Sequence, residues 1–286
     1  MEPSRPSAGE AEAPTLIKVP ARRVRTPPPD SPLHGAATPW TVLGPPDAPA
    51  IVFVHATRLS RAQWSAQVRL LAPRYRTIAL DLPGHGARAA EPFTLEAAAR
   101  AVADAIEAEA PSGRAVVVGL SLGGYVAIET AARYPGRVAG LVLAGCSAEP
   151  AGGRAWPFRV LAATLERVPA PVLRSLNDAF FTLRYPPRLA GPIVGGGYWR
   201  RGGAEGVRQL VGRKFLDRLS RLWTPVLVIN GALDPVFGPG GAAWAAACRR
   251  GRHAVIRRAM HLSNLDRPRT FSALVAAFTD EAAAST

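Results

Sequence analysis

Residues 116–125, VVVGLSLGGY, are the stretch from which the rest of the chain can be interpreted. Three successive valines predict a buried strand of a parallel sheet, and residues 126–132 have the composition of a helix. Between them stands Gly-x-Ser-x-Gly, in which Gly119 and Gly123 leave room for a sharp, strained turn. Such a turn exposes the Ser121 hydroxyl at the carboxyl end of a strand, above the positive end of a helix. Ser121 is therefore a candidate nucleophile, and an ordinary serine in a glycine-rich turn is the alternative.

The composition is that of a globular protein. The chain has 286 residues, of which 48% are hydrophobic and 20% charged, enough for one large domain or two modest ones. No window approaches the run of about 18 apolar residues that a transmembrane helix needs. The polar, proline-rich N-terminus lacks a signal pattern, which by default predicts a cytoplasmic location. The only cysteines, Cys146 and Cys248, are expected to be buried thiols rather than a disulfide or metal ligands.

The formal net charge of +14 raises nucleic acids, acidic surfaces and anionic substrates as partners. However, only Lys18 and Lys214 are lysines, and the arginines are scattered along the chain. This arginine bias, with abundant alanine, glycine and proline, suggests a GC-rich coding bias rather than a binding surface. We therefore expect no nucleic-acid or membrane partner, while a homodimer remains open.

Strands alternate with helices from about residue 50 onward, as in a parallel sheet covered on both faces. Residues 1–36 are rich in Pro, Arg, Ser and Glu, and we expect a disordered extension there. Residues 16–24 and 40–43 could add short antiparallel edge strands. The other expected strands are residues 51–55, 77–80, 116–118, 138–144, 225–230 and 253–256.

Residues 148–216 interrupt this alternation with a segment that contains no strand of the same type. An insertion after the carboxyl end of a strand lies over the place where the chemistry is expected. We therefore expect a mostly helical cap on a core of residues 37–147 and 217–286, with a second, unrelated helical subdomain as the alternative. The segment carries the aromatic residues Trp156, Phe158, Phe180, Phe181, Tyr185, Tyr198 and Trp199.

A serine nucleophile needs a general base within hydrogen-bond reach. Among the five histidines, His261 follows the strand at residues 253–256 by a short loop, which places it at the same edge of the sheet as Ser121. His253 begins that strand and so belongs to the opposite edge, and His34 lies in the N-terminal extension. His261 is therefore the predicted base, and a surface loop histidine is the alternative.

The base in turn needs an acid that orients its ring, and Asp234 follows the strand at residues 225–230 by three residues. Pro235 biases Asp234 toward an extended conformation that helps to fix its direction. Asp266 more simply caps the last helix, so Asp234 is the predicted acid. The order Ser, Asp, His is that of enzymes with a nucleophile elbow.

The tetrahedral intermediate also needs hydrogen-bond donors for its oxyanion. The amide of Leu122 is correctly placed next to the nucleophile. A second donor is expected from the loop after residues 51–55, where the backbone amide of Thr57 is best placed. His55 is expected to order this loop rather than to react.

Together these motifs resemble the α/β-hydrolase fold superfamily, of the small proline-iminopeptidase, epoxide-hydrolase and C–C-hydrolase type. The resemblance runs from about residue 50 to the C-terminus and implies a doubly wound, mostly parallel sheet. It also implies a helical cap inserted after the sixth strand, and no cofactor or metal. The features that carry it are His55 with the loop to Trp64, DLPGHG at residues 81–86, the Gly-x-Ser-x-Gly turn, Asp234 and His261.

The chain departs from the family pattern at two positions. Ala56 replaces the usual glycine after His55, so the oxyanion loop is expected to differ slightly. Arg88 stands where the motif after Asp81 usually ends in serine, with little catalytic effect expected. A serine nucleophile in place of an aspartate argues against epoxide and haloalkane hydrolysis.

These observations predict a serine hydrolase that cleaves an ester, lactone, thioester or C–C bond of a small-molecule acyl substrate. A non-hydrolytic lyase or acyl transferase on the same scaffold is one alternative, and a binding protein with low turnover is another. The cap aromatics favour an apolar pocket for this substrate. Five cap arginines could instead bind a substrate carboxylate, or lie on a solvated surface: Arg154, Arg159, Arg184, Arg188 and Arg200.

Overall fold

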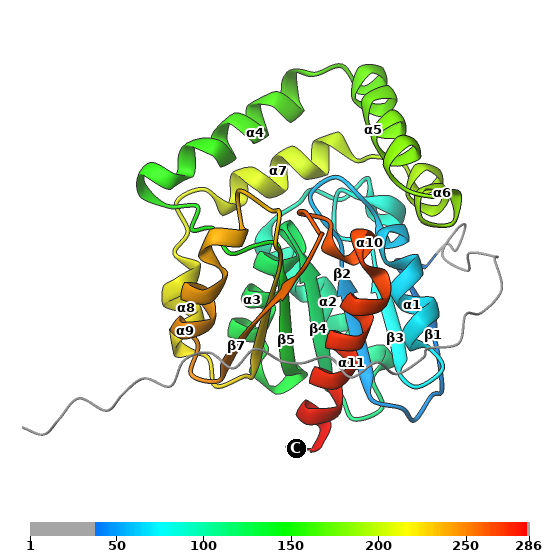
Figure 1. Ribbon diagram of the computed structural model, residues 1–286, viewed down its shortest axis with the longest axis vertical. Coiled ribbons are helices and arrows are strands. Elements are labelled where there is room, and N and C mark those ends of the chain that lie inside the picture. Colours follow the sequence, from blue (N-terminus) through cyan, green and yellow to red (C-terminus); the bar gives the residue numbers. More distant parts are fainter. Residues whose placement is uncertain (1–37, 285–286) are drawn as a thin grey trace, which may run out of the picture.

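The fold is a seven-stranded sheet with helices on both faces, seen in a computed structural model that describes residues 38–284 (Figure 1). The spatial order of the strands is β1-β3-β2-β4-β5-β6-β7. Only β1 runs antiparallel to its neighbour, and every other pair is parallel. The strands are β1 (Trp40–Leu43), β2 (Ala50–Val54), β3 (Arg76–Leu80), β4 (Ala115–Leu120), β5 (Val138–Ala144), β6 (Val226–Gly231) and β7 (Gly251–Ile256).

Two hydrophobic clusters lie on the two faces of the sheet, because its central strands are mostly apolar and are buried at every position. Helices α1 (Ser65–Leu71) and α11 (Pro268–Ala284) cover one face. The other face is covered by α2 (Leu95–Glu109), α3 (Leu122–Arg133), α8 (Phe215–Arg221) and α9 (Gly241–Ala247). The predicted doubly wound, mostly parallel sheet is therefore confirmed.

Individual elements follow from local signals in the sequence. The side chain of Thr94 accepts a hydrogen bond from the amide of Ala97 and so caps α2. Phe271, Leu274, Val275 and Phe278 of the last helix are buried in the core, and both cysteines are buried free thiols as expected. In the described part of the chain, none of the helices is long and apolar enough to cross a membrane.

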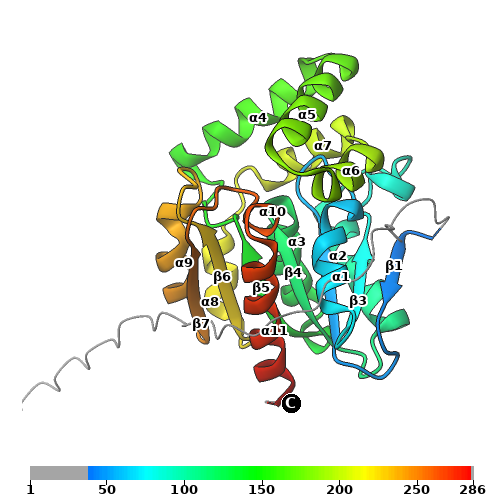
Figure 2. The same ribbon diagram turned by 45° about the vertical axis from the view of Figure 1, so that its right-hand side comes forward.

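Four further helices form a layer above the carboxyl ends of the strands (Figures 1 and 2). They follow β5, which is the fifth strand of the described residues. The count of six strands before the cap included an expected strand at residues 16–24, which lies outside the described residues, as does the expected disordered extension at residues 1–36. The four helices are α4 (Trp156–Arg167), α5 (Ala170–Arg184), α6 (Pro187–Gly196) and α7 (Arg200–Leu210).

The next helix, α8, crosses the expected end of the cap at residue 216 and packs on the core. Its Phe215 ring lies 4.7 Å from the ring of Tyr125 in α3, measured between centroids. Phe158 of α4 contacts the same tyrosine edge-on, with 6.2 Å between centroids. Tyr125 therefore anchors both α8 and the first cap helix to the helix that follows Ser121.

Candidate active site

Ser121 lies between β4 and α3 in a backbone conformation that is rare for a side-chain-bearing residue, with φ 55° and ψ −119°. This strain depends on its two neighbouring glycines. A Cβ on Gly119 would overlap the backbone of Gly123, and a Cβ on Gly123 would overlap the carbonyl of Val54 in β2. The predicted strand–turn–helix geometry around Ser121 is therefore present, and only glycine fits at both flanking positions.

Asp234 and His261 are in direct contact at the same edge of the sheet. His261 Nδ1 lies 3.0 Å from Asp234 Oδ2. The other oxygen, Oδ1, accepts hydrogen bonds from the amides of Val236 (3.0 Å) and Phe237 (3.1 Å). The carboxylate is 1% exposed, so nearly all of its stabilisation comes from these three partners.

Burial alone would raise the pKa of Asp234, but the hydrogen bond from His261 and the two amides outweigh it and lower the pKa below its ordinary value. The carboxylate is therefore ionised throughout the neutral range. A depressed pKa stabilises the folded protein above the pKa of the unfolded chain. That contribution is lost as the pH falls through the lower value of the folded state.

Two backbone contacts bring Ser121 and His261 to one place. The amide of Ser121 donates to the carbonyl of Ala144 at the end of β5 (2.9 Å). A Cβ on the next residue, Gly145, would lie 3.0 Å from His261 Nδ1, so the imidazole rests against this glycine. In the described part of the chain, the Ser121 hydroxyl has no hydrogen bond to His261. Hydrogen bonds between catalytic groups are often long until the substrate is in place.

Phe237 contributes to the site although the sequence analysis did not identify it. Its ring stacks on the His261 imidazole, with 4.9 Å between centroids and 24° between planes. Its amide also holds Asp234. One residue therefore orients both partners of the pair, and its position three residues after Asp234 was the only available signal.

The loop that carries Thr57 is fixed by three contacts from three segments. The amide of Ala56, which stands at the usual glycine position, donates to Gln63 Oε1 (2.8 Å). His85 Nε2 lies 2.7 Å from the carbonyl oxygen of Thr57. The carbonyl of Arg58 accepts from the amide of Trp199, which ties the loop to the start of α7 (2.9 Å).

These contacts leave the two expected oxyanion donors available. Leu122 is the first residue of α3, where amide groups have no partner within the helix. The Thr57 amide makes no hydrogen bond in the described part of the chain. His55 is fully buried, accepts from the amide of Leu82 (3.0 Å) and contacts the Ala56 carbonyl, which is the ordering role expected of it. Burial, reinforced by the neighbouring His85, lowers the pKa of His55 well below its ordinary value.

Glycines of α7 let the cap approach this loop closely. A Cβ on Gly203 would lie 2.7 Å from the carbonyl oxygen of Thr57 and 3.3 Å from Cβ of Arg58. A Cβ on Gly206 would lie 2.7 Å from the side chain of Leu122. The cap therefore rests on both residues expected to supply oxyanion donors. A larger residue at Gly203 would meet backbone, whereas one at Gly206 would meet the movable side chain of Leu122.

We expect Gly203→Ala to lower the free energy of unfolding by about 1–3 kcal/mol, because the added methyl group meets backbone rather than a movable side chain. Gly153→Ala, in the short helix at Gly152–Ala155, is the matched control within the cap. Its Cβ would meet nothing within 4 Å, so this substitution should leave the free energy of unfolding unchanged or raise it by about 0.4–1 kcal/mol. Urea unfolding of the two variants measures both effects, and equal stabilities would contradict the close approach of α7.

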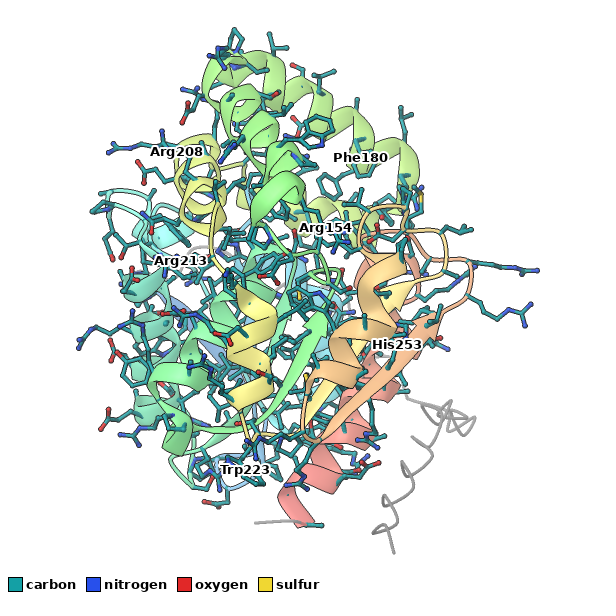
Figure 3. The ribbon with its side chains drawn as sticks, turned by 90° about the vertical axis from the view of Figure 1, so that its left-hand side faces the viewer. Arg154, Phe180, Arg208, Arg213, Trp223 and His253 are labelled. Atoms are coloured by element: carbon teal, nitrogen blue, oxygen red, sulfur yellow. The ribbon has the colours of Figure 1, made fainter. Side chains whose placement is uncertain are left out.

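The expected cap arginines lie mainly on the surface. Arg184 pairs with Asp266 (2.8 Å), and Arg200 donates to the carbonyl of Glu166 in α4 (2.6 Å). The remaining three are exposed: Arg154 (labelled in Figure 3), Arg159 and Arg188.

Asp266 does not act as the helix cap that the sequence suggested. Its carboxylate accepts from the amide of Met260 (2.6 Å) and from the Tyr185 hydroxyl (2.9 Å). It therefore connects the loop that carries His261 to the cap residue Tyr185.

A large cavity, of about 710 Å³, lies at the opposite end of the molecule from the candidate site, beside Trp223 (Figure 3). It is lined by residues at the amino ends of the strands, such as Val138 and Pro225, and by none of the expected site residues. No group of three or more His, Cys, Asp or Glu in residues 38–284 is arranged to hold a metal ion. The candidate residues Ser121, Asp234 and His261 all lie at the other, carboxyl edge of the sheet.

Comparison with known proteins agrees with this geometry. A family model described as the alpha/beta hydrolase family matches residues 51–274. The chain is 25% identical over 249 residues to 3-oxoadipate enol-lactonase 2 of Acinetobacter baylyi, covering 83% of this chain and 91% of that protein. It is 28% identical over 260 residues to a pimeloyl-(acyl-carrier protein) methyl ester esterase of Neisseria meningitidis, covering 82% of this chain and 95% of that protein.

Solved structures show the same relationship. A thermophilic esterase from Thermogutta terrifontis, described as malate bound, is similar with a TM-score of 0.69 and 25% identity, covering 85% of this chain and 93% of that one. The enol-lactonase from Burkholderia xenovorans shares the fold with a TM-score of 0.70 at 23% identity, covering 84% of this chain and 95% of that one. The family match spans the sheet from β2 to β7, the cap and every candidate site residue, and it leaves out the edge strand β1. The chain belongs to the alpha/beta hydrolase family.

Proposed function

We propose that the protein is a serine hydrolase that cleaves a carboxylic ester or lactone through an acyl-enzyme. The observation that carries the proposal is the buried Asp234–His261 pair, held at the edge of the sheet where the strained Ser121 stands. Relatives named as esterases and enol-lactonases support the bond class. Both bonds present the same carbonyl carbon to the nucleophile.

The proposed reaction begins when Ser121 Oγ attacks the carbonyl carbon and His261 Nε2 takes the hydroxyl proton. Asp234 fixes the tautomer in which Nδ1 carries a proton, and it stabilises the imidazolium that forms. The amides of Thr57 and Leu122 donate to the oxyanion. His261 then gives the proton to the leaving alkoxide, and afterwards activates the water that releases the acid and restores the serine.

A fluorophosphonate probe tests whether the serine is activated. We expect stoichiometric labelling at Ser121, found by peptide mass spectrometry, together with hydrolysis of p-nitrophenyl acetate. Heat-denatured protein is the control, because an unactivated serine hydroxyl reacts poorly. Absence of labelling in the folded protein would remove the serine mechanism and leave the binding-protein alternative. Labelling with a burst of p-nitrophenol but no steady turnover would favour an acyl transferase.

A further inference from the structure

Arg58 follows the expected oxyanion donor Thr57 directly, and its side chain lies between that loop and α5. Nε of Arg58 donates to Oδ1 of Asn177 in α5 (3.1 Å). This is the only hydrogen bond of the guanidinium in the described part of the chain. No carboxylate of those residues lies within 4.0 Å of it, whereas most cap arginines have an acidic or carbonyl partner.

Asn177 carries a second unused donor at the same place. The residue is 4% exposed, and its amide nitrogen Nδ2 has no hydrogen-bond partner among the described residues. Its orientation is fixed, because an arginine only donates, so Oδ1 must face Arg58 and the NH2 group must point elsewhere. A buried polar donor without an acceptor is uncommon in folded proteins.

No carboxylate of the described residues forms an ion pair with Arg58. Burial lowers the pKa of the Arg58 guanidinium from its ordinary value, but the group stays protonated. Tyr198 is the titratable neighbour that acts on it electrostatically, and it raises this pKa. Asp178 Oδ2 lies 3.8 Å from Nε of Arg174, and the Asp178 carboxylate acts on Tyr198 rather than directly on Arg58. Arg58 is thus a partly buried positive charge, and the terminal NH2 groups of its guanidinium have no hydrogen-bond acceptor among the described residues.

We propose that Arg58 and Asn177 form a subsite for a carboxylate carried by the substrate, so that the enzyme selects esters or lactones with a second, anionic group. This inference rests on the proposed function for its kinetic consequence. Guanidinium and amide donors match the two oxygens of a carboxylate. Arg58 follows Thr57 in the chain and its guanidinium contacts Asn177 of cap helix α5, so a carboxylate held by the two side chains would lie on the cap side of the loop that supplies the Thr57 amide.

The kinetic test compares monomethyl esters of dicarboxylic acids, from succinate to suberate, with methyl esters of the same length that end in a methyl group. Acetate esters of hydroxy acids and of simple alcohols form a second arm, which places the charge on the leaving group. We expect the ratio of kcat/KM for charged over neutral esters to fall about 100-fold in Arg58→Gln in one of the arms. The exposed Arg159→Gln is the matched control and should leave the ratio as in the wild type.

Asn177→Asp is a second variant that keeps Arg58. Its carboxylate should pair with the Arg58 guanidinium and abolish the preference for charged esters. A loss of packing alone would lower kcat/KM for charged and neutral esters alike. Equal losses of kcat/KM for charged and neutral esters in Arg58→Gln and Asn177→Asp would overturn the subsite.

A binding measurement separates this inference from the proposed reaction. Calorimetric titration of Ser121→Ala with the free dicarboxylates should give binding that weakens about 100-fold when Arg58→Gln is added. Arg58-dependent binding, together with no esterase activity in the wild-type protein, would retain the subsite and remove the proposed function. Wild-type esterase activity with no preference for charged esters and no dicarboxylate binding would retain the proposed function and remove the subsite.

Discussion

Ser121→Ala is expected to lower kcat for ester hydrolysis by at least about 10⁴-fold, because no covalent acyl-enzyme can form. The oxyanion donors and the Asp234–His261 pair would remain, and they account for any residual rate above water. Steady-state kinetics on p-nitrophenyl acetate measures the loss. Retention of most of the activity would show that another residue is the nucleophile.

Two companion variants distinguish loss of chemistry from loss of structure. Ser112→Ala changes a serine in an exposed loop and should keep wild-type turnover. Ser121→Gly should be as inactive as Ser121→Ala but no less stable than the wild type, because glycine relieves the strain of a positive φ, which costs about 1–3 kcal/mol. If Ser121→Gly unfolded at lower temperature than the wild type, the strain argument for this turn would be wrong.

The sequence predicted what depends on local patterns. The valines of β4 and the two glycines around Ser121 each satisfy a constraint set by neighbours within a few residues. The histidine–aspartate contact also followed from topology alone, since both residues leave parallel strands at the same edge. A sequence pattern of this kind determines the local backbone geometry, so the structure can be predicted from it.

Contacts made across the fold could not be predicted in the same way. Nothing near Phe237 indicates that its ring would stack on His261, and Asp266 looked like a helix cap but braces a loop. The sequence did not distinguish Arg58 from the other arginines, because its contact with Asn177 depends on where α5 lies in the fold. The arginines named from the cap sequence lie mainly on its surface. The sequence could not predict this, because helix spacing alone does not tell which side of an inserted helix meets the core.

Asp234→Asn should be nearly as damaging as loss of the nucleophile. We expect kcat to fall by about 10³–10⁴-fold, because an amide can donate to Nδ1 of His261 and so favour the tautomer that cannot accept the serine proton. The variant also gives up the charge that the amides of Val236 and Phe237 stabilise. Activity on p-nitrophenyl acetate, with the rate of fluorophosphonate labelling of Ser121, reports both consequences.

Asp266→Asn is the matched control for that variant, since Asp266 also lies beside the His261 loop but bonds to Met260, Arg184 and Tyr185 instead of the imidazole. An asparagine at position 266 keeps an acceptor for the Met260 amide, so its cost should appear in stability rather than in kcat. The two aspartates therefore make opposite predictions. If both variants lost activity to the same extent, a general effect of negative charge near His261 would replace the orienting role assigned to Asp234. A large loss of kcat confined to Asp234→Asn would support an acid that acts by holding one tautomer of one ring.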